Sequence, residues 1–178
     1  MSKISPKKTA TPTHIIHPFP ALFDADSRIL ILGSFPSVKS REQNYFYGHP
    51  QNRFWKLMAL LFEKDTGGTP PQTIAEKTAL CQSHHIALWD TIHSCDIVGS
   101  SDSSITNVVP NDFGKILETA DIRQIYCNGK ASFNLYQKYC EPVTGRSATA
   151  LPSTSPANAA WSLDKLYEAW ACILEKLV

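Results

Sequence analysis

The chain of 178 residues has little net charge and no long hydrophobic run. Seventeen Lys and Arg nearly balance sixteen Asp and Glu, and the formal net charge is +1. Such a balance does not by itself indicate a nucleic-acid-binding protein, although a local basic patch can still bind nucleic acid. Because about 18 consecutive apolar residues are needed to cross a bilayer, we expect no membrane span. The polar residues 1–16 also lack a secretory apolar core. They are predicted to form a flexible tail before a single domain at 17–178.

Cysteine pairs and metal-ligand spacings are also missing. The five cysteines are odd in number and contain no CxxC pair, which argues against zinc or iron–sulfur ligation. The simpler interpretation of the cysteines is that they are buried, reduced thiols in a cytoplasmic protein. Four histidines, His49, His84, His85 and His93, match no common ligand pattern. We therefore expect no metal and no cofactor.

Three common catalytic and nucleotide-binding motifs are absent. The chain has neither GxGxxG nor GxxxxGK[ST], which disfavours a dinucleotide-binding or P-loop protein. It has no GxSxG elbow, which disfavours a Ser–His–Asp hydrolase. Whatever chemistry the chain performs must come from other residues.

What the chain does have is an alternation of apolar strands and amphipathic helices. The pattern predicts strands at 28–33, 85–90 and 122–129 and a short one ending near 151. It predicts helices at 52–63, 73–83, 111–119, 130–140 and 159–178, with Thr73 and Asn111 as caps and Glu76 completing a capping box. The Ser-rich segment 94–111 is expected to be a loop that can hold a short turn. Alternating strands and helices indicate an α/β fold with a parallel sheet covered on both faces.

The carboxyl ends of the predicted strands carry small or polar residues. These ends are 33–37, 89–91, 128–130 and 151–155. In an open parallel sheet, ligands bind beyond the carboxyl ends of the strands. We therefore expect the four segments to converge on one site.

The loop after the first strand has an unusual content. Tyr45, Phe46 and Tyr47 stand in a row and cannot all face one core, so at least one should line an opening, where a ring can stack on a base. Asn52 either caps the next helix or holds a water or anion at its start. Asp90, at the end of a buried strand, either caps a loop or contacts a ligand. The Pro/Ser loop at 151–158 is either a plain turn or a phosphate-binding segment.

Three segments together resemble a known family. "LGSFPS", "YGHPQNRFWK" and "LPSTSPA" are similar to motifs of the uracil-DNA glycosylase superfamily, and more narrowly of its hypoxanthine (deoxyinosine) DNA glycosylase branch. "LWDTIHSC", "GSSDSSI" and "NDF" resemble the same branch, so the likeness runs from about His17 to the last helix. It implies a three-layer α/β/α sandwich around a four-stranded parallel sheet. It also implies cofactor-free hydrolysis of the N-glycosidic bond of a flipped, deaminated base.

The sequence departs from the superfamily pattern at three positions. Phe35 stands where many members carry an Asp or Asn that orients the attacking water. Leu151 replaces the catalytic His of uracil-specific members, and Ser155 replaces the Leu that they insert into DNA. By motif matching, the branch moves the water-positioning role to Asn52.

The resemblance also assigns the remaining site residues. Tyr47 matches the position that stacks on the flipped base, and Asp90 stands where uracil-specific members have a base-reading Asn. The full base-binding set is Ser34, Phe35, Tyr47, Asp90 and Asn128, and the DNA-binding set is Ser37, Gly129, Lys130, Ser153, Thr154 and Ser155. The implied partner is double-stranded DNA containing deaminated bases, with single-stranded DNA as a further substrate, and we expect a monomer.

Three other readings stay open. One is a uracil-DNA glycosylase with a broad pocket. Another is an inactive DNA lesion-binding module, since the usual Asp and His are missing. The weakest is a flavodoxin-like nucleotide-binding domain, which would leave "HPQNRFW" unexplained.

Overall fold

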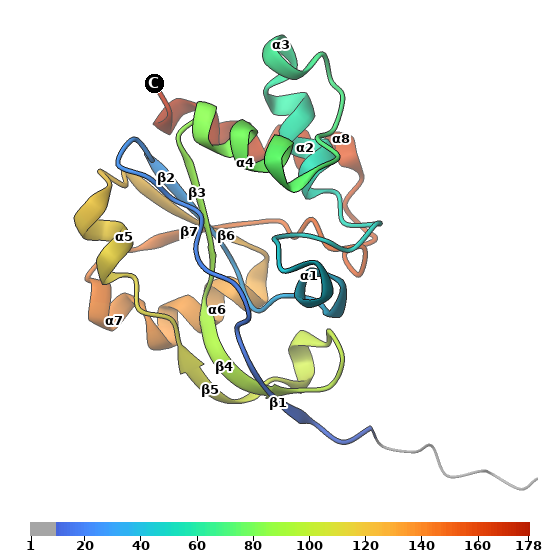
Figure 1. Ribbon diagram of the computed structural model, residues 1–178, viewed down its shortest axis with the longest axis vertical. Helices are drawn as coiled ribbons and strands as arrows, with labels where there is room; N and C mark the ends of the chain where they lie inside the picture. Colours follow the sequence, from blue (N-terminus) through green and yellow to red (C-terminus); the bar gives the residue numbers. More distant parts are fainter. Residues whose placement is uncertain (1–9) are drawn as a thin grey trace, which may run out of the picture.

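A parallel sheet of four strands forms the centre of the molecule in the computed structural model, which describes residues 10–178 (Figure 1). The strand order is β3 (Ile86–Asp90), β2 (Ile29–Gly33), β6 (Gln124–Asn128) and β7 (Ala148–Leu151). All three strand pairs are parallel. The parallel sheet predicted from the alternating pattern is confirmed.

Helices cover both faces of this sheet. The helices α2 (Phe54–Leu61), α4 (Ile74–Ser83) and α8 (Leu163–Trp170) lie on one face, and α5 (Gly114–Thr119) and α6 (Lys130–Tyr139) on the other. Side chains alternate across a strand, so Ile29 and Ile31 enter the first core while Leu30 and Leu32 enter the second. A strand buried on both faces must be apolar throughout, as β2 is. The three-layer α/β/α sandwich is therefore confirmed.

Several short helices connect these elements. They are α1 (Val38–Gln43), α3 (Glu63–Thr66), α7 (Glu141–Thr144) and the 3₁₀ turns η1 (Asp102–Ser104) and η2 (Ala171–Lys176). Of these, α1 lies inside the segment read as a loop, and the closing helix predicted at 159–178 divides into α8 and η2. No helix within residues 10–178 has the length and apolar character needed to cross a bilayer.

A second sheet was missed by the sequence reading. It is antiparallel and consists of β1 (Thr13–Ile16), β4 (Ile92–Ile97) and β5 (Thr106–Pro110), in the order β1-β4-β5. The loop predicted at 94–111 is therefore wrong, because most of it is β4, η1 and β5. The flexible tail predicted at 1–16 is wrong for Thr13–Ile16, and its residues 1–9 lie outside the described residues.

Of the two predicted helix caps, one is confirmed and the other is wrong. Thr73 caps α4, and its hydroxyl and the Glu76 carboxylate form the predicted capping box. Asn111 is no helix cap, since α5 begins only at Gly114. Its side-chain amide instead donates to the carbonyl oxygens of Asp90 (2.8 Å) and Ile92 (3.1 Å). Asn111 therefore fixes the strand end at which Asp90 sits.

The five cysteines are all free. Cys81, Cys95, Cys127 and Cys140 are buried, and Cys172 is half-buried. The prediction of buried, reduced thiols is confirmed for four of the five.

Candidate active site

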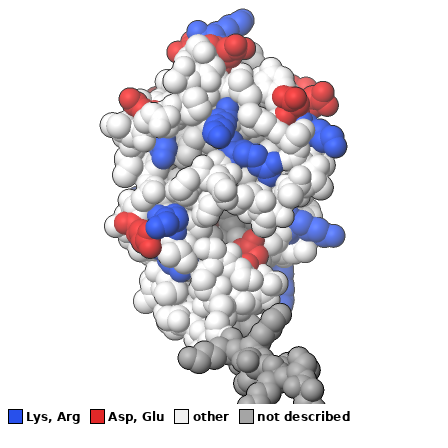
Figure 2. Space-filling view, turned by 90° about the vertical axis from the view of Figure 1, so that its right-hand side faces the viewer, with Lys and Arg blue, Asp and Glu red and all other residues white. Residues whose placement is uncertain are grey.

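A cavity of about 280 Å³ lies at the carboxyl ends of the parallel strands. Gly33, Asp90, Asn128 and Ser153, one from each of the four predicted segments, all line it. The predicted convergence is therefore confirmed. Figure 2 shows the hollow on this face, with Lys and Arg side chains scattered around it.

A buried ion-pair geometry holds Asp90 at the cavity wall. Oδ2 of Asp90 lies 2.7 Å from Nε2 of His17, and both side chains are almost fully buried. The His17 ring is itself packed against Phe19 and Trp89, at centroid distances of 4.5 and 4.6 Å. The sequence reading missed His17, because an isolated histidine before the first buried strand carries no motif.

Gly33 is required by the position of Asp90. A Cβ atom added to Gly33 would lie 2.3 Å from Oδ1 of Asp90 and 3.8 Å from the hydroxyl oxygen of Tyr47. The glycine thus lets a carboxylate oxygen approach the end of β2. With Oδ2 engaged by His17, Oδ1 is the oxygen of Asp90 available to a ligand.

The three consecutive aromatics divide between core and cavity. Tyr45 and Phe46 are buried in the core. Tyr47 lines the cavity, and one face of its ring stacks on Phe54 at a centroid distance of 3.9 Å. Its φ of 52° is unusual for an aromatic residue and turns the chain at this point. The prediction that at least one of the three lines an opening is confirmed.

The Tyr47 hydroxyl lies at the inner end of this ring. Its oxygen is buried and makes no hydrogen bond within 3.5 Å, although the Asn128 side chain lies near enough to act on its pKa. Burial, followed by the negative charge of Asp90, raises the pKa of Tyr47 above its ordinary value. The group is therefore a neutral donor at physiological pH.

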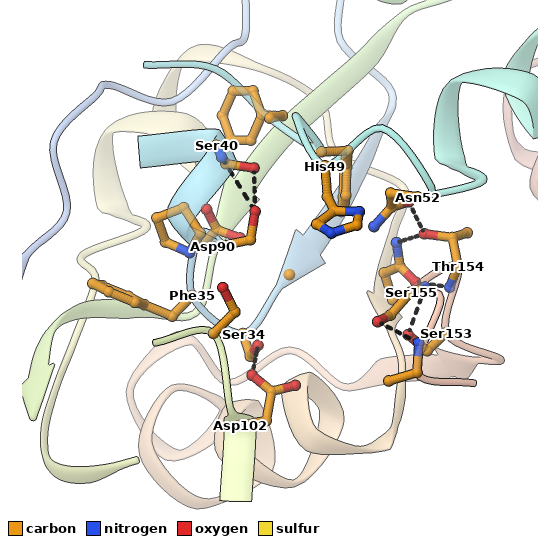
Figure 3. A pocket seen from close by; sticks show the side chains of 18 of the residues that line it. Ser34, Phe35, Ser40, His49, Asn52, Asp90, Asp102, Ser153, Thr154 and Ser155 are labelled. Carbon is orange, nitrogen blue, oxygen red and sulfur yellow. Dashed lines mark hydrogen bonds between the residues drawn. The ribbon is translucent and has the colours of Figure 1, made fainter. Parts of the chain in front are cut away.

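Asn52 points one end of its amide into the cavity. Its Oδ1 accepts hydrogen bonds from the Phe54 backbone N–H (3.0 Å) and from the Thr154 hydroxyl (2.8 Å). Because both partners donate, the oxygen is committed and the NH₂ group is the end that remains. Figure 3 shows this nitrogen directed into the cavity, towards His49. Asn52 thus accepts from the first N–H of α2, whose N-cap residue is Arg53, and lines the cavity at once.

A relay of hydrogen bonds fixes this orientation. Asn128 Nδ2 donates to Thr154 Oγ1 (2.9 Å), and the Thr154 backbone N–H donates to Asn128 Oδ1 (3.0 Å). The Thr154 carbonyl accepts from Arg53. Thr154 is fully buried, and the DNA contact predicted for it stays a prediction. Its polar groups are occupied within the protein, and it orients Asn52.

Arg53 ties the Pro/Ser loop to the start of α2. Its guanidinium donates to the carbonyl oxygens of Ser155 (2.8 Å) and Asn158 (3.0 Å), and also to that of Trp161. One planar group with several donors suits such a fan of carbonyls. The sequence reading did not assign a role to Arg53, although the residue lies in the quoted motif. Ser153 and Ser155 line the cavity beside it.

The other predicted DNA contacts occupy different positions. Ser37 lines the cavity, and its hydroxyl caps α1 by accepting from the Ser40 N–H. Gly129 is buried with its N–H donating to the Leu151 carbonyl oxygen, and the phosphate contact predicted for it stays a prediction. A Cβ there would lie 3.0 Å from Ser153, so Gly129 serves close packing. Lys130 is exposed at the start of α6.

Ser34 contacts a second carboxylate at the cavity, that of Asp102, which the sequence analysis did not assign to the site. Its hydroxyl donates to Asp102 Oδ1 at 2.7 Å, as Figure 3 shows. Much of Asp102 is open to solvent, yet its carboxyl group faces the cavity, where desolvation raises its pKa. Asp102 belongs to η1, within the "GSSDSSI" segment, and only the pairing of β4 with β5 carries it to the cavity.

Comparison with known proteins shows the family to which the chain belongs. A family model described as the uracil DNA glycosylase superfamily matches residues 20–177. The chain belongs to this superfamily. It is 30% identical over 155 residues to a protein of Methanosarcina acetivorans named hypoxanthine DNA glycosylase, covering 87% of this chain and 95% of that one. A namesake from Methanosarcina barkeri is 31% identical over 157 residues, covering 86% and 94%.

A solved structure shares the superfamily fold. It is a solution NMR structure of a candidate uracil DNA glycosylase from Methanosarcina acetivorans. It has a TM-score of 0.75 and 31% sequence identity, and the match covers 92% of this chain and 99% of that one.

The departures from the superfamily pattern are visible in the site. Phe35 lines the cavity as a mostly buried ring, and Leu151 is buried in the core. Neither can transfer a proton. Within residues 10–178, no three His, Cys, Asp or Glu side chains gather into a metal-binding cluster. The polar groups that line the cavity are amide, carboxylate and hydroxyl groups, together with the imidazole of His49.

Proposed function

We propose that this protein is a DNA glycosylase that hydrolyses the N-glycosidic bond of a deaminated base, with hypoxanthine as the preferred base and uracil as the second. The observation that carries the proposal is the Asn52 amide, which the Thr154 and Phe54 donors hold with its NH₂ group in the cavity. Superfamily membership and the two relatives named hypoxanthine DNA glycosylase support the same function.

The size of the cavity supports a flipped nucleotide. About 280 Å³ is at the low end for small-molecule pockets and suits one base. A duplex cannot enter it, so the target nucleotide must rotate out of the stack, which costs a few kcal/mol. A hypoxanthine or uracil wobble pair lowers that cost and thereby contributes to selectivity.

Binding of the flipped base follows from the cavity walls. Oδ1 of Asp90 accepts a hydrogen bond from N1–H of hypoxanthine or N3–H of uracil. Tyr47, Phe35 and Ser34 line the cavity around the bound base. Asn128 acts through Thr154 more than on the base directly, because its amide is engaged with that residue.

Bond cleavage builds positive charge on the sugar and negative charge on the departing base. The NH₂ group of Asn52 donates to a water oxygen and holds that water against the sugar carbon. An amide is no base at ordinary pH, so the reaction depends on stabilising the leaving base. Its rate is set by donors aimed at the base and by the geometry of the water.

Contacts with the DNA backbone are proposed for the rim of the cavity. Ser153 and Ser155 stand on the loop held by Arg53, and exposed Lys130 and the start of α1 at Ser37 offer further phosphate contacts. The proposed substrate is double-stranded DNA with a deaminated base, or single-stranded DNA. The enzyme is proposed to act as a cytoplasmic monomer without a cofactor.

The test is Asn52→Ala on duplexes containing hypoxanthine, uracil or xanthine. Abasic sites are scored by alkaline strand cleavage under single-turnover conditions, and DNA affinity by fluorescence anisotropy. We expect base release to fall on the order of 100-fold or more, with affinity nearly unchanged. Asn107→Ala is the matched control, because Asn107 donates to Asp96 in the antiparallel sheet.

The outcomes separate the competing functions. A near-normal rate for Asn52→Ala contradicts the role given to this amide. Tight binding of damaged duplexes by the unmodified protein without any abasic sites would instead identify a lesion-binding module. Faster release of uracil than of hypoxanthine would identify a broad uracil-DNA glycosylase.

A further inference from the structure

One polar group in the cavity is left without a hydrogen-bond partner. Among the buried side-chain polar atoms in residues 10–178, two have none: the Tyr47 hydroxyl oxygen and Nδ1 of His85. Of these two residues, only Tyr47 lines the cavity. Buried hydroxyl groups are nearly always paired in folded proteins, so an orphan on a residue that lines a cavity calls for an explanation. A ligand that brings an acceptor would supply it.

The orphan lies beside the free oxygen of Asp90. The space above Gly33 is 2.3 Å from Asp90 Oδ1 and 3.8 Å from the Tyr47 hydroxyl oxygen. Because Gly33 has no side chain, the Asp90 carboxylate can occupy that space. The other oxygen of Asp90 is held by His17. The end of β2 thus presents an acceptor and a donor next to each other, both buried.

The Tyr47 hydroxyl keeps its role as a donor at neutral pH. Burial and the charge of Asp90 raise the pKa of Tyr47, so its hydroxyl stays protonated and can donate. The ring cannot swing away easily, because it stacks on Phe54 at 3.9 Å. A donor that is fixed before the ligand arrives loses little entropy on binding.

We infer that the Tyr47 hydroxyl donates a hydrogen bond to the carbonyl oxygen of the flipped base while Asp90 Oδ1 accepts from the adjacent ring N–H. This inference rests on the proposed glycosylase function and names how its site selects a base. Hypoxanthine offers a carbonyl at position 6 and a hydrogen on N1. Adenine has a bare N1, which would face Asp90 Oδ1 as acceptor against acceptor, so Asp90 supplies the discrimination against adenine, whereas the Tyr47 hydroxyl could accept from its amino group.

The pair therefore recognises the lactam edge that hydrolytic deamination creates. Uracil and xanthine carry the same arrangement of carbonyl and N–H. The contact also acts on the chemical step, because negative charge on the departing base spreads onto its carbonyl oxygen. A fixed donor at that oxygen stabilises the charge as it develops. Asp90 alone cannot do this, since a carboxylate has no proton to give.

The experiment compares two bases in two proteins. Tyr47→Phe keeps the ring and its contact with Phe54 but removes the donor. The substrates are duplexes with hypoxanthine or with 6-thiohypoxanthine, whose sulfur is a poor acceptor while its N1–H is retained. Tyr45→Phe is the matched control, because the Tyr45 hydroxyl bonds Thr78 in the core at 2.6 Å.

The inference makes a definite forecast for single-turnover base release. Tyr47→Phe should release hypoxanthine about 10- to 100-fold more slowly than the unmodified protein. On 6-thiohypoxanthine the two proteins should differ by less than about threefold, because the lost bond is already weak there. Tyr45→Phe should match the unmodified protein on both bases. Circular dichroism and thermal unfolding verify that each variant is folded.

The possible failures are distinguishable. Equal rates for Tyr47→Phe and the unmodified protein on hypoxanthine overturn this inference and leave the glycosylase function intact. Equal losses on both bases also overturn it, since the hydroxyl would then serve the structure of the cavity. An unmodified protein that releases neither hypoxanthine, uracil nor xanthine overturns the proposed function and this inference together.

Discussion

Thr154 Oγ1 donates a hydrogen bond of 2.8 Å to Oδ1 of Asn52, joining two residues that are 102 positions apart in the chain. The bond determines which end of the Asn52 amide faces the cavity. Without it, the amide could turn over and present its oxygen. The Pro/Ser loop therefore contributes to the proposed chemistry through Asn52, in addition to any contact with DNA.

Replacing Thr154 by Val tests this relationship. The change keeps the shape of the side chain, removes the donor to Asn52 and leaves Asn128 Nδ2 without its acceptor. We expect base release to fall about tenfold and the free energy of unfolding to fall by about 1–3 kcal/mol, the cost of buried groups left unpaired. Single-turnover kinetics and urea denaturation measure the two effects.

Thr78→Val is the control for that experiment. Thr78 also shares a hydrogen bond, with Tyr45, but it lies on α4 away from the cavity. It should lose some stability and keep its rate of base release. A Thr154→Val protein that keeps the full rate would show that the Asn52 amide needs no support from this loop.

Two histidine–aspartate pairs with the same separation allow a second prediction. His17 and Asp90 are buried and 2.7 Å apart, whereas His14 and Asp96 are also 2.7 Å apart but largely exposed. His17→Phe keeps an aromatic ring but leaves the buried Asp90 carboxylate without its partner. We therefore expect a loss of about 2–3 kcal/mol in the free energy of unfolding. Hypoxanthine release should also fall about tenfold or more, because Asp90 loses its fixed position.

His14→Phe is the matched comparison. Exposed ion pairs contribute little, so this variant should keep nearly the stability and activity of the unmodified protein. Urea unfolding and single-turnover release are measured for both. If the two variants lose the same stability and the same rate of base release, burial of the His17–Asp90 pair does not contribute to function.

Gly33→Ala is expected to block the base-binding end of the cavity. Its Cβ would lie 2.3 Å from Asp90 Oδ1, which no real structure accommodates without movement. The strand or the carboxylate must shift, at a cost of about 1–3 kcal/mol. We expect hypoxanthine release to drop by at least 100-fold while affinity for undamaged DNA changes little. Gly114→Ala is the control, because its Cβ would meet only the exposed Asp112 side chain, at 3.1 Å.

The sequence predicted the central sheet well because local pattern and burial agree there. Continuous apolar runs such as Ile29–Gly33 can only be buried on both faces, and helices must then supply the covering layers. The antiparallel sheet was missed for the opposite reason. Its strand β5 is short and at most half-buried, and it mixes two polar residues with two valines and a proline, so no local signal distinguishes it from a loop. Pairing with β4, which no single segment encodes, makes it a strand.

In the site, too, some features could be predicted from the sequence and others could not. The convergence of strand ends, the cavity-lining aromatic at Tyr47 and the double position of Asn52 could be predicted from motif and topology. The roles of His17, Arg53 and Asp102 could not. Each depends on a partner from a distant segment, and a hydrogen bond leaves no trace in the local periodicity of either segment. Thr154 and Gly129 were assigned to DNA because loops are usually exposed, whereas both are buried here.

By itself, the sequence determined the parallel sheet, its helical layers and the edge at which a ligand binds, since apolar spacing fixes which faces must leave water. Tertiary structure alone decided which polar atoms remain available in the cavity. Bonds from His17, Thr154 and the Phe54 N–H consume one end of Asp90 and one end of Asn52. What is left is a carboxylate oxygen, an amide NH₂ and the Tyr47 hydroxyl. Their directions follow from long-range packing, because each group is oriented by a neighbour that folding brings to it.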